Sequence, residues 1–142
     1  PRTDPAVIVA VIDADDRLLL CRQTIWPEKR YSIVSGYVEP GETAEHAVHR
    51  EVLEETGIPV RDLQYLGSQP LPFPASLMLC YSASAIDTAI SVDGVELEHA
   101  IWVSRDELRA SVATGELLLP SRVSIARRAI EHWFGEPLDD PS

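Results

Sequence analysis

Runs of apolar residues along the chain predict the strands of a β-sheet. Residues 7–12 form a β-branched run that is closed by the polar sequence Asp13-Ala14-Asp15-Asp16, and a second apolar run follows at residues 17–22. Two such runs joined by a short polar turn predict a β-hairpin. Shorter strands are also predicted at residues 31–35, ending at Gly36, and at residues 60–67, 76–83 and 99–103.

Between the third and fourth of these strands the pattern changes to that of a helix. Residues 43–56 contain good helix formers, with Thr43 available as the N-cap and Gly57 in the C-terminal capping position. Pro59 prevents the helix from continuing, because proline has no N–H to donate. We therefore expect one helix that begins at Thr43 and ends at Thr56.

Two more helices are predicted in the last third of the chain. Ser104 and Glu107 have the spacing of a capping box, which predicts a short helix at about residues 105–113. At about residues 123–134, apolar residues recur every three or four positions, and Gly135 follows them. Strands and helices in this order predict a single α/β domain with a mixed β-sheet between helices.

The 142 residues are enough for one domain, which we place at residues 1–135 and follow with a loose, polar tail at residues 136–142. Cys21 and Cys80 lie in apolar runs, so we expect buried free thiols and a reducing compartment, the cytoplasm. No apolar run approaches the roughly 18 residues that a membrane-spanning helix needs. Because the chain begins at Pro1, we expect a processed product or part of a longer protein.

The charge of the chain limits what it can bind unaided. Its formal net charge is -11, and arginine and lysine residues form no stripe that could follow a phosphate backbone. Extensive contacts to nucleic acid are therefore disfavoured. An acidic protein that handles phosphates needs divalent cations to mediate the contact.

The helix at residues 43–56 carries glutamates that suit such cations. Glu51, Glu54 and Glu55 are three and four residues apart, so they share an arc of roughly 100° on the helix. The same arc contains small apolar residues that predict a core-facing side, namely Ala44, Ala47 and Val48. Carboxylates turned toward the core repel one another unless cations lie between them, and oxygen ligands of this kind suit Mg²⁺ or Mn²⁺.

A solvated acidic helix face is the alternative interpretation, and the residues around the helix argue against it. Gly36 lets the chain leave its strand sharply, and Gly41 permits a tight loop before the helix. Arg50 lies beside Glu51 and four residues before Glu54, so its guanidinium can hold a carboxylate in one orientation. These features favour a built site over a solvated surface.

The segment from Gly36 to Ile58 resembles the Nudix box at each of its defining positions, including the run Arg-Glu-Val-Leu-Glu-Glu-Thr-Gly-Ile. The resemblance implies the Nudix fold, an α/β/α sandwich whose loop-helix-loop binds two or more divalent cations. It also implies that an activated water attacks a phosphorus of a nucleoside diphosphate linked to another group. By this resemblance Glu51, Glu54 and Glu55 are metal ligands, and we take Glu54 as the base.

The segment Ser68-Gln69-Pro70-Leu71-Pro72-Phe73-Pro74-Ala75-Ser76 resembles the Ser-Gln-Pro-Trp-Pro-Phe-Pro-x-Ser array of the NADH pyrophosphatase branch of this family. Leu71 replaces the tryptophan of that array, which weakens the inference about substrate. A rigid connector between two strands is the alternative interpretation. The similarity extends from Pro1 to about Ile130, where the closing helix carries Ala126. It assigns contacts with substrate to Gln69, Pro70, Phe73, Ser76 and Ala126.

Three further residues receive roles from the same resemblance. Glu96 lies six residues before Trp102, where the branch has another metal ligand and an alternative base, whereas Glu98 is expected to be surface charge. Tyr37 occupies the position of an aromatic residue that stacks on adenine, although a half-buried tyrosine at a strand end is an equal alternative. The backbone carbonyl of Ser35 is a candidate metal ligand.

Together these features predict Mg²⁺- or Mn²⁺-dependent hydrolysis of NADH or NAD⁺ to nicotinamide mononucleotide and AMP, with Glu54, Glu96 and Arg50 in the catalytic machinery. The resemblance also allows removal of NAD caps from RNA, and it implies a homodimer. Alternatives are a pyrophosphohydrolase of ADP-ribose, dinucleoside polyphosphates or nucleoside triphosphates, and a non-catalytic nucleotide-binding module. Zinc is not expected, because the four-cysteine module of the branch is absent and Cys21 and Cys80 cannot replace it.

Overall fold

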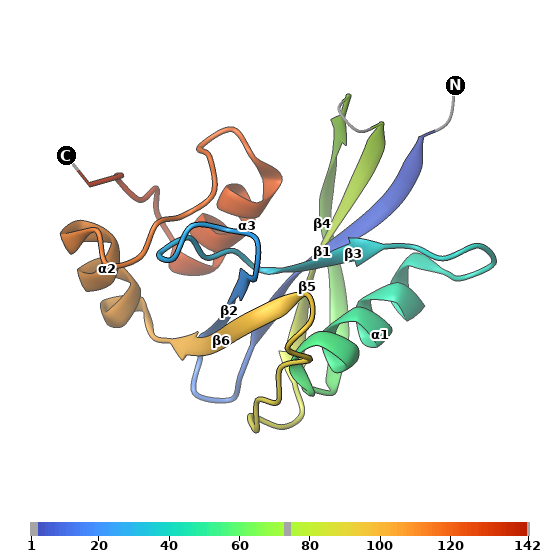
Figure 1. Ribbon diagram of the computed structural model, residues 1–142, viewed down its shortest axis with the longest axis horizontal. Coiled ribbons are helices and arrows are strands. Elements are labelled where there is room, and N and C mark those ends of the chain that lie inside the picture. Colours follow the sequence, from blue (N-terminus) through green and yellow to red (C-terminus); the bar gives the residue numbers. More distant parts are fainter. Residues whose placement is uncertain (1–2, 73–74, 142) are drawn as a thin grey trace.

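The computed structural model describes residues 3–72 and 75–141, and it has the predicted α/β architecture (Figure 1). A mixed sheet lies between α1 on one side and α2 and α3 on the other. In chain order the elements are β1 (Asp4–Ile12), β2 (Leu18–Gln23), β3 (Val34–Tyr37), α1 (Ala44–Thr56), β4 (Val60–Leu71), β5 (Ser76–Ala85), β6 (Leu97–Val103), α2 (Arg105–Thr114) and α3 (Ile125–Phe134).

The sheet has the strand order β4-β5-β1-β2-β6, and β3 pairs with β1 beside that path. The pairing of β1 with β5 is parallel, and the other pairings are antiparallel, so the predicted mixed sheet is confirmed. The predicted hairpin is also present, with Ile12 opposite Leu18. The same edge of β1 pairs with β3 from Ala6 to Val9, with Val7 opposite Gly36.

Strand β1, at the centre of the sheet, is a continuous apolar run because both of its faces are buried. Its side chains alternate between two cores, as they must on a pleated strand. Val7, Val9 and Val11 are fully buried in the core that α1 covers. Ile8 and Ala10 face the core that α2 and α3 cover. Since helices cover both faces, neither set of side chains is left in water.

Several strand boundaries differ from the sequence prediction, and two of them involve glycines. Strand β3 begins at Val34 and continues through Gly36 to Tyr37, so Gly36 does not end it. Strand β4 continues beyond Gly67 to Leu71, because its last residues pair with β5. Pro70 is tolerated there because β4 is an edge strand, where the missing N–H leaves no ladder bond unmade.

The looseness expected of the C-terminal tail stays a prediction, and its described residues 136–141 make contacts with the rest of the domain. Leu138 is only 6% exposed, and its N–H donates to Glu131 over 2.6 Å. The guanidinium of Arg127, itself 1% exposed, donates to the carbonyl of Leu138 over 2.7 Å and to Asp140 over 3.0 Å. A buried guanidinium must have acceptors, and the tail supplies them.

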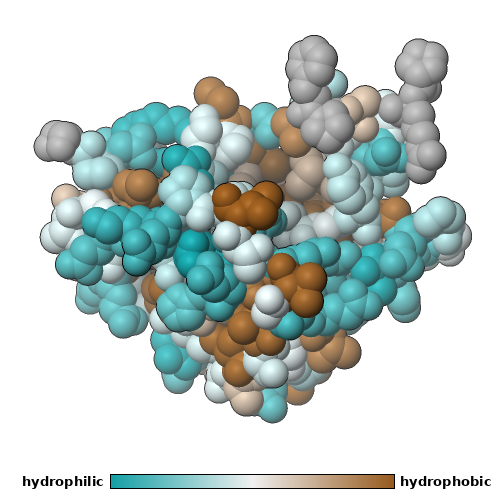
Figure 2. Space-filling view, viewed as in Figure 1, coloured by the Kyte–Doolittle hydropathy of each residue, from teal (hydrophilic) through white to brown (hydrophobic). Residues whose placement is uncertain are grey.

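The helix ends follow the predicted capping residues. Thr43 caps α1, Ser104 and Glu107 form the predicted capping box of α2, and Gly135 ends α3 in the left-handed conformation. The last helix begins at Ile125 rather than at residue 123, because Ser124 is its N-cap. Surfaces over α1 and α2 are largely hydrophilic, as expected for helices that cover a sheet (Figure 2).

Both cysteines are buried and free, as predicted. Burial raises the pKa of the Cys80 thiol to about 11, so this thiol is protonated and inert at neutral pH. Within residues 3–72 and 75–141, no helix is long and apolar enough to cross a bilayer.

Candidate active site

Helix α1 is fixed at both ends and along one face. The hydroxyl of Thr43 accepts a hydrogen bond from the N–H of His46 over 3.0 Å at the start of the helix. At the other end, Gly57 takes a left-handed conformation with φ of 74°. Ala47 and Val48 are fully buried against the sheet, as predicted. This packing sets the rotation of the helix and therefore which glutamates face the sheet.

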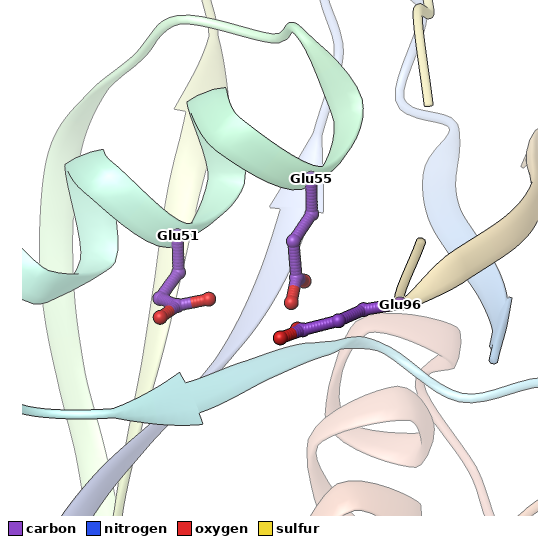
Figure 3. Close-up of side chains that lie close together, drawn as sticks. All are labelled: Glu51, Glu55 and Glu96. Atoms are coloured by element: carbon purple, nitrogen blue, oxygen red, sulfur yellow. The ribbon is translucent and has the colours of Figure 1, made fainter. Parts of the chain in front are cut away.

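Three carboxylates converge beside the sheet, and we call Glu51, Glu55 and Glu96 the carboxylate cluster. One oxygen from each lies within 4.8 Å of the others. Figure 3 shows Glu51 and Glu55 descending from α1, while Glu96 approaches from the segment before β6 and points toward Glu55. Glu51 and Glu55 are 9% and 4% exposed, whereas Glu96 is open to solvent. The cluster is therefore a shallow site with one accessible side.

The electrostatics of the cluster favour a cation. Burial raises the pKa of Glu55 to about 10, and the neighbouring carboxylates of Glu96 and Glu51 add to the shift. Burial also raises the pKa of Glu51, although Arg50 opposes this effect. Since all the donors are carboxylate oxygens that can supply two or three ligands from one side, the cluster fits a hard divalent cation such as Mg²⁺ or Mn²⁺.

Gly36 makes room for the cluster rather than turning the chain. It lies within β3, and a Cβ at this position would overlap the carboxylate of Glu51. Only glycine lets that carboxylate lie directly against the backbone of the strand. Ser35, the preceding residue, pairs with Ile8 in β1. Its backbone therefore lies next to Gly36, against which the carboxylate of Glu51 packs. The role of its carbonyl as a metal ligand stays a prediction.

Arg50 holds a second set of acceptors, which we call the Arg50 network. Its guanidinium donates to both carboxylate oxygens of Glu42, over 2.8 and 2.9 Å, and to Glu51 over 2.8 Å. It also donates to the carbonyl of Tyr37 over 3.0 Å, which ties the end of β3 to α1. The predicted orientation of a carboxylate by Arg50 is thus present. Its main partners are Glu42 and Glu51 rather than Glu54.

Glu54 lies apart from the carboxylate cluster. Its side chain is 61% exposed, and its nearest ionic partner is Arg50, at 3.4 Å. On the helix it occupies the outer margin of the predicted arc, so packing turned Glu51 and Glu55 inward and left Glu54 at the rim. Its predicted roles as ligand and base stay predictions.

Asp93 is a residue of this site that the sequence analysis missed. Its carboxylate accepts hydrogen bonds from the N–H groups of Val95, Glu96 and Leu97, over 3.0 to 3.2 Å. Its own N–H donates to the carbonyl of Glu55 over 3.2 Å. Asp93 therefore ties the turn that carries Glu96 to the end of α1. The Asp93-Gly94 pair is a turn signal in the sequence, but its partner across the site is not visible there.

The described residues assigned to substrate lie on four elements, β3, β4, β5 and α3. Tyr37 is 53% exposed at the end of β3. Gln69 and Pro70 lie near the end of β4, and Ser76, at the start of β5, is 4% exposed. Ala126 is buried in the first turn of α3. Phe73 lies outside the described residues.

Comparisons with known proteins identify the family of this chain. The profile of the NUDIX domain matches residues 2–127, so the chain belongs to the Nudix family. A relative named NAD-capped RNA hydrolase NudC, from Mycobacterium bovis (strain BCG / Pasteur 1173P2), is 49% identical over 142 residues, which cover 94% of this chain and 45% of the relative. NAD-capped RNA hydrolase NUDT12 from Macaca fascicularis is 42% identical over 138 residues, covering 94% of this chain and 30% of the relative.

These relatives confirm the resemblance to the NADH pyrophosphatase branch, and the chain spans less than half of their length. Among solved structures, a NUDIX hydrolase from Nitrosomonas europaea has a TM-score of 0.69 and 25% identity, with 97% of this chain and 95% of that one covered. A MutT NUDIX hydrolase from Burkholderia pseudomallei has a TM-score of 0.67 at 22% identity, covering 96% and 98% of the two chains. The second likeness shows the shared fold alone.

Proposed function

We propose that this chain hydrolyses the pyrophosphate bond of NADH or NAD⁺, giving nicotinamide mononucleotide and AMP, with Mg²⁺ or Mn²⁺ as cofactor. The observation that carries the proposal is the carboxylate cluster, which gathers three acidic side chains within 4.8 Å. Support for this substrate class comes from the names of the relatives, both of which are NAD-capped RNA hydrolases. Removal of NAD caps from RNA is part of the proposal.

Each residue of the site has a role that its position supports. Glu51, Glu55 and Glu96 would hold two or more cations, with the carbonyl of Ser35 as a further ligand. Such ions neutralise phosphate charge and lower the pKa of a bound water. Arg50 keeps Glu51 in one orientation through its 2.8 Å hydrogen bond. Glu54, exposed at the rim, is the proposed base, and Glu96 is the alternative.

The nucleotide would bind between Tyr37 and the β4–β5 segment. Tyr37 offers an exposed ring on which adenine can stack. Pro70, Ser76 and Ala126 are the proposed contacts from the resemblance, together with Phe73. Leu71, 37% exposed, offers less aromatic surface than the tryptophan it replaces. We also propose a homodimer in the cytoplasm, from the family resemblance and the buried free thiols.

A substrate panel tests the proposal. The chain is incubated with NADH, NAD⁺, ADP-ribose or nucleoside triphosphates in the presence of Mg²⁺ or Mn²⁺, and products are identified by mass. We expect AMP and the nicotinamide mononucleotide from NADH at the highest efficiency. Pyrophosphate from triphosphates as the main product would contradict the proposal and select a rival activity. Binding without turnover of any substrate would select the non-catalytic module.

The same assay tests the base. We expect Glu54→Gln to lower kcat by about 100-fold or more, because a carboxamide cannot accept the proton. The melting temperature should not change, because the side chain is 61% exposed. Glu45→Gln, on the same helix, is the matched control, since its amide oxygen can still accept the hydrogen bond from Tyr81. Unchanged kcat in Glu54→Gln would transfer the role to Glu96.

A further inference from the structure

Gln69 joins two segments that are far apart in the sequence. Its side-chain Nε2 donates to the carbonyl of Val123 over 2.9 Å, and its Oε1 accepts from the N–H of Ile125 over 2.9 Å. One end of the carboxamide is therefore a donor and the other an acceptor, both to backbone. This pairing fixes which way the amide faces and engages each of its ends within the protein.

The contact with Ile125 completes the start of α3. Ile125 is the first residue of this helix, and its N–H has no carbonyl within the helix to bond. Ser124 caps the helix by accepting from the N–H of Arg127 over 3.1 Å. The N–H of Ile125 donates to Gln69 instead. Gln69 thus caps α3 from a neighbouring strand.

The start of α3 is held from its other side as well. The guanidinium of Arg127 donates to the carbonyls of Pro120 and Leu138 over 2.9 and 2.7 Å, and it pairs with Asp140. The helix start is therefore anchored to the preceding loop and to the C-terminal tail without Gln69. If the Gln69 contacts were removed, we expect the end of β4, an edge strand, to shift rather than the helix.

We infer that Gln69 is a positioning residue, which sets the end of β4 against the start of α3 and does not itself contact substrate. The inference rests on the proposed function, which places nucleotide contacts at Pro70 and Ala126. Pro70 follows Gln69 directly, and Ala126 follows Ile125, so the two contacts flank the bridge. Gln69 fixes the distance between them before the nucleotide arrives.

The test compares Gln69→Met with Gln64→Met in the 142-residue chain. Methionine keeps the length of the side chain but makes neither hydrogen bond. Gln64 is an exposed residue of the same strand, and its side chain makes no hydrogen bond within the described residues. We expect Gln69→Met to raise the KM for NADH by roughly 10-fold with kcat within about twofold of wild type, since misplacement weakens binding while the carboxylate cluster is untouched. Gln64→Met should change neither constant.

Amide hydrogen exchange in the substrate-free chain separates positioning from direct contact. The N–H of Ile125 should exchange faster in Gln69→Met than in wild type, and the side-chain amide signals of Gln69 should not move when AMP is added to wild type. Unchanged KM, unchanged exchange at Ile125, or AMP-dependent shifts of those side-chain signals would each overturn the inference. Absence of NADH hydrolysis in wild type would instead contradict the proposed function, and the exchange measurement would still decide whether Gln69 braces α3.

Discussion

The carboxylate cluster and the Arg50 network share helix α1, and they differ in the source of the cation beside their carboxylates. In the Arg50 network a guanidinium donates to both oxygens of Glu42, and this contact holds the pKa of Glu42 well below its usual range. In the cluster, burial raises the pKa of Glu55 to about 10, and the facing carboxylates of Glu96 and Glu51 add to the shift. Glu51 belongs to both groups, because Arg50 also donates to it.

This difference distinguishes acidic side chains that are paired with an arginine in the fold from acidic side chains that can bind a cation. A carboxylate that meets an arginine inside the fold is stabilised in its charged form and needs nothing further. Within residues 3–72 and 75–141, no lysine or arginine forms an ion pair with Glu55 or Glu96. Neutralisation of Glu55 therefore depends on a proton or on a cation from solution. Whether a glutamate of this site is paired in the fold thus depends on its neighbours, because the residue type is the same in both groups.

The largest effect is expected from Glu55→Gln. Metal-dependent hydrolysis should fall by at least about 100-fold, because one charged ligand of the cluster is lost. The metal-free protein should become more stable near neutral pH, by about 1–4 kcal/mol, because the raised pKa of Glu55 makes the folded chain take up a proton that a neutral amide does not need. Product formation with Mn²⁺ measures the first effect, and thermal unfolding with and without Mn²⁺ measures the second. If Mn²⁺ stabilises the variant as much as wild type, Glu55 is not a ligand.

A change of opposite sign is expected from Arg50→Met. This variant leaves Glu42 without its guanidinium partner, and we expect a fall in the free energy of unfolding larger than that from losing an exposed ion pair, measured by urea denaturation. Arg61→Met is the control, since Arg61 is 67% exposed and lies 3.7 Å from Asp62, so its loss should cost less than about 1 kcal/mol. Equal losses in the two variants would remove the distinction between the Arg50 network and ordinary surface charge.

The smallest effect is expected in the acid limb of the stability profile. Glu42 has a lowered pKa in the folded chain, so it stabilises the fold above its ordinary pKa of 4.5 and loses this contribution as pH falls through the lowered pKa. Between about pH 5 and pH 2, the melting temperature of wild type should fall more steeply than that of Glu42→Gln. Arg50→Met removes the cause of the shift and should show the same shallow profile. Parallel profiles for all three would contradict the role of the pair.

Some features of the site could be predicted from neighbouring residues alone. Thr43 and Gly57 bound α1 as expected, since a cap depends on hydrogen bonds within one turn of the chain. The spacing of Glu51 and Glu55 placed both on one helix face for the same reason. The inward rotation of that face followed from Ala47 and Val48, which are buried in the core.

Other features required contacts between distant segments. The spacing treated Glu54 as equivalent to Glu51 and Glu55, but packing of α1 on the sheet left its side chain 61% exposed. Gly36 was expected to end a strand. Glycine is required at this position for another reason, because the carboxylate of Glu51 occupies the space that a Cβ would fill. The tail is polar in sequence, and its contact with the buried guanidinium of Arg127 is visible only in the folded chain.

The helices and strands, the helix caps and the alternation that buries both faces of β1 could be read from the chain, because they depend on hydrogen bonds and steric effects between residues close together. The box segment from Gly36 to Ile58, by which the family can be identified, could be read in the same way. Which carboxylates meet became visible only in the folded chain, since Glu96 reaches Glu55 through the turn built by Asp93. Charge–charge distances depend on packing between segments, and the spacing of residues in one segment does not contain them.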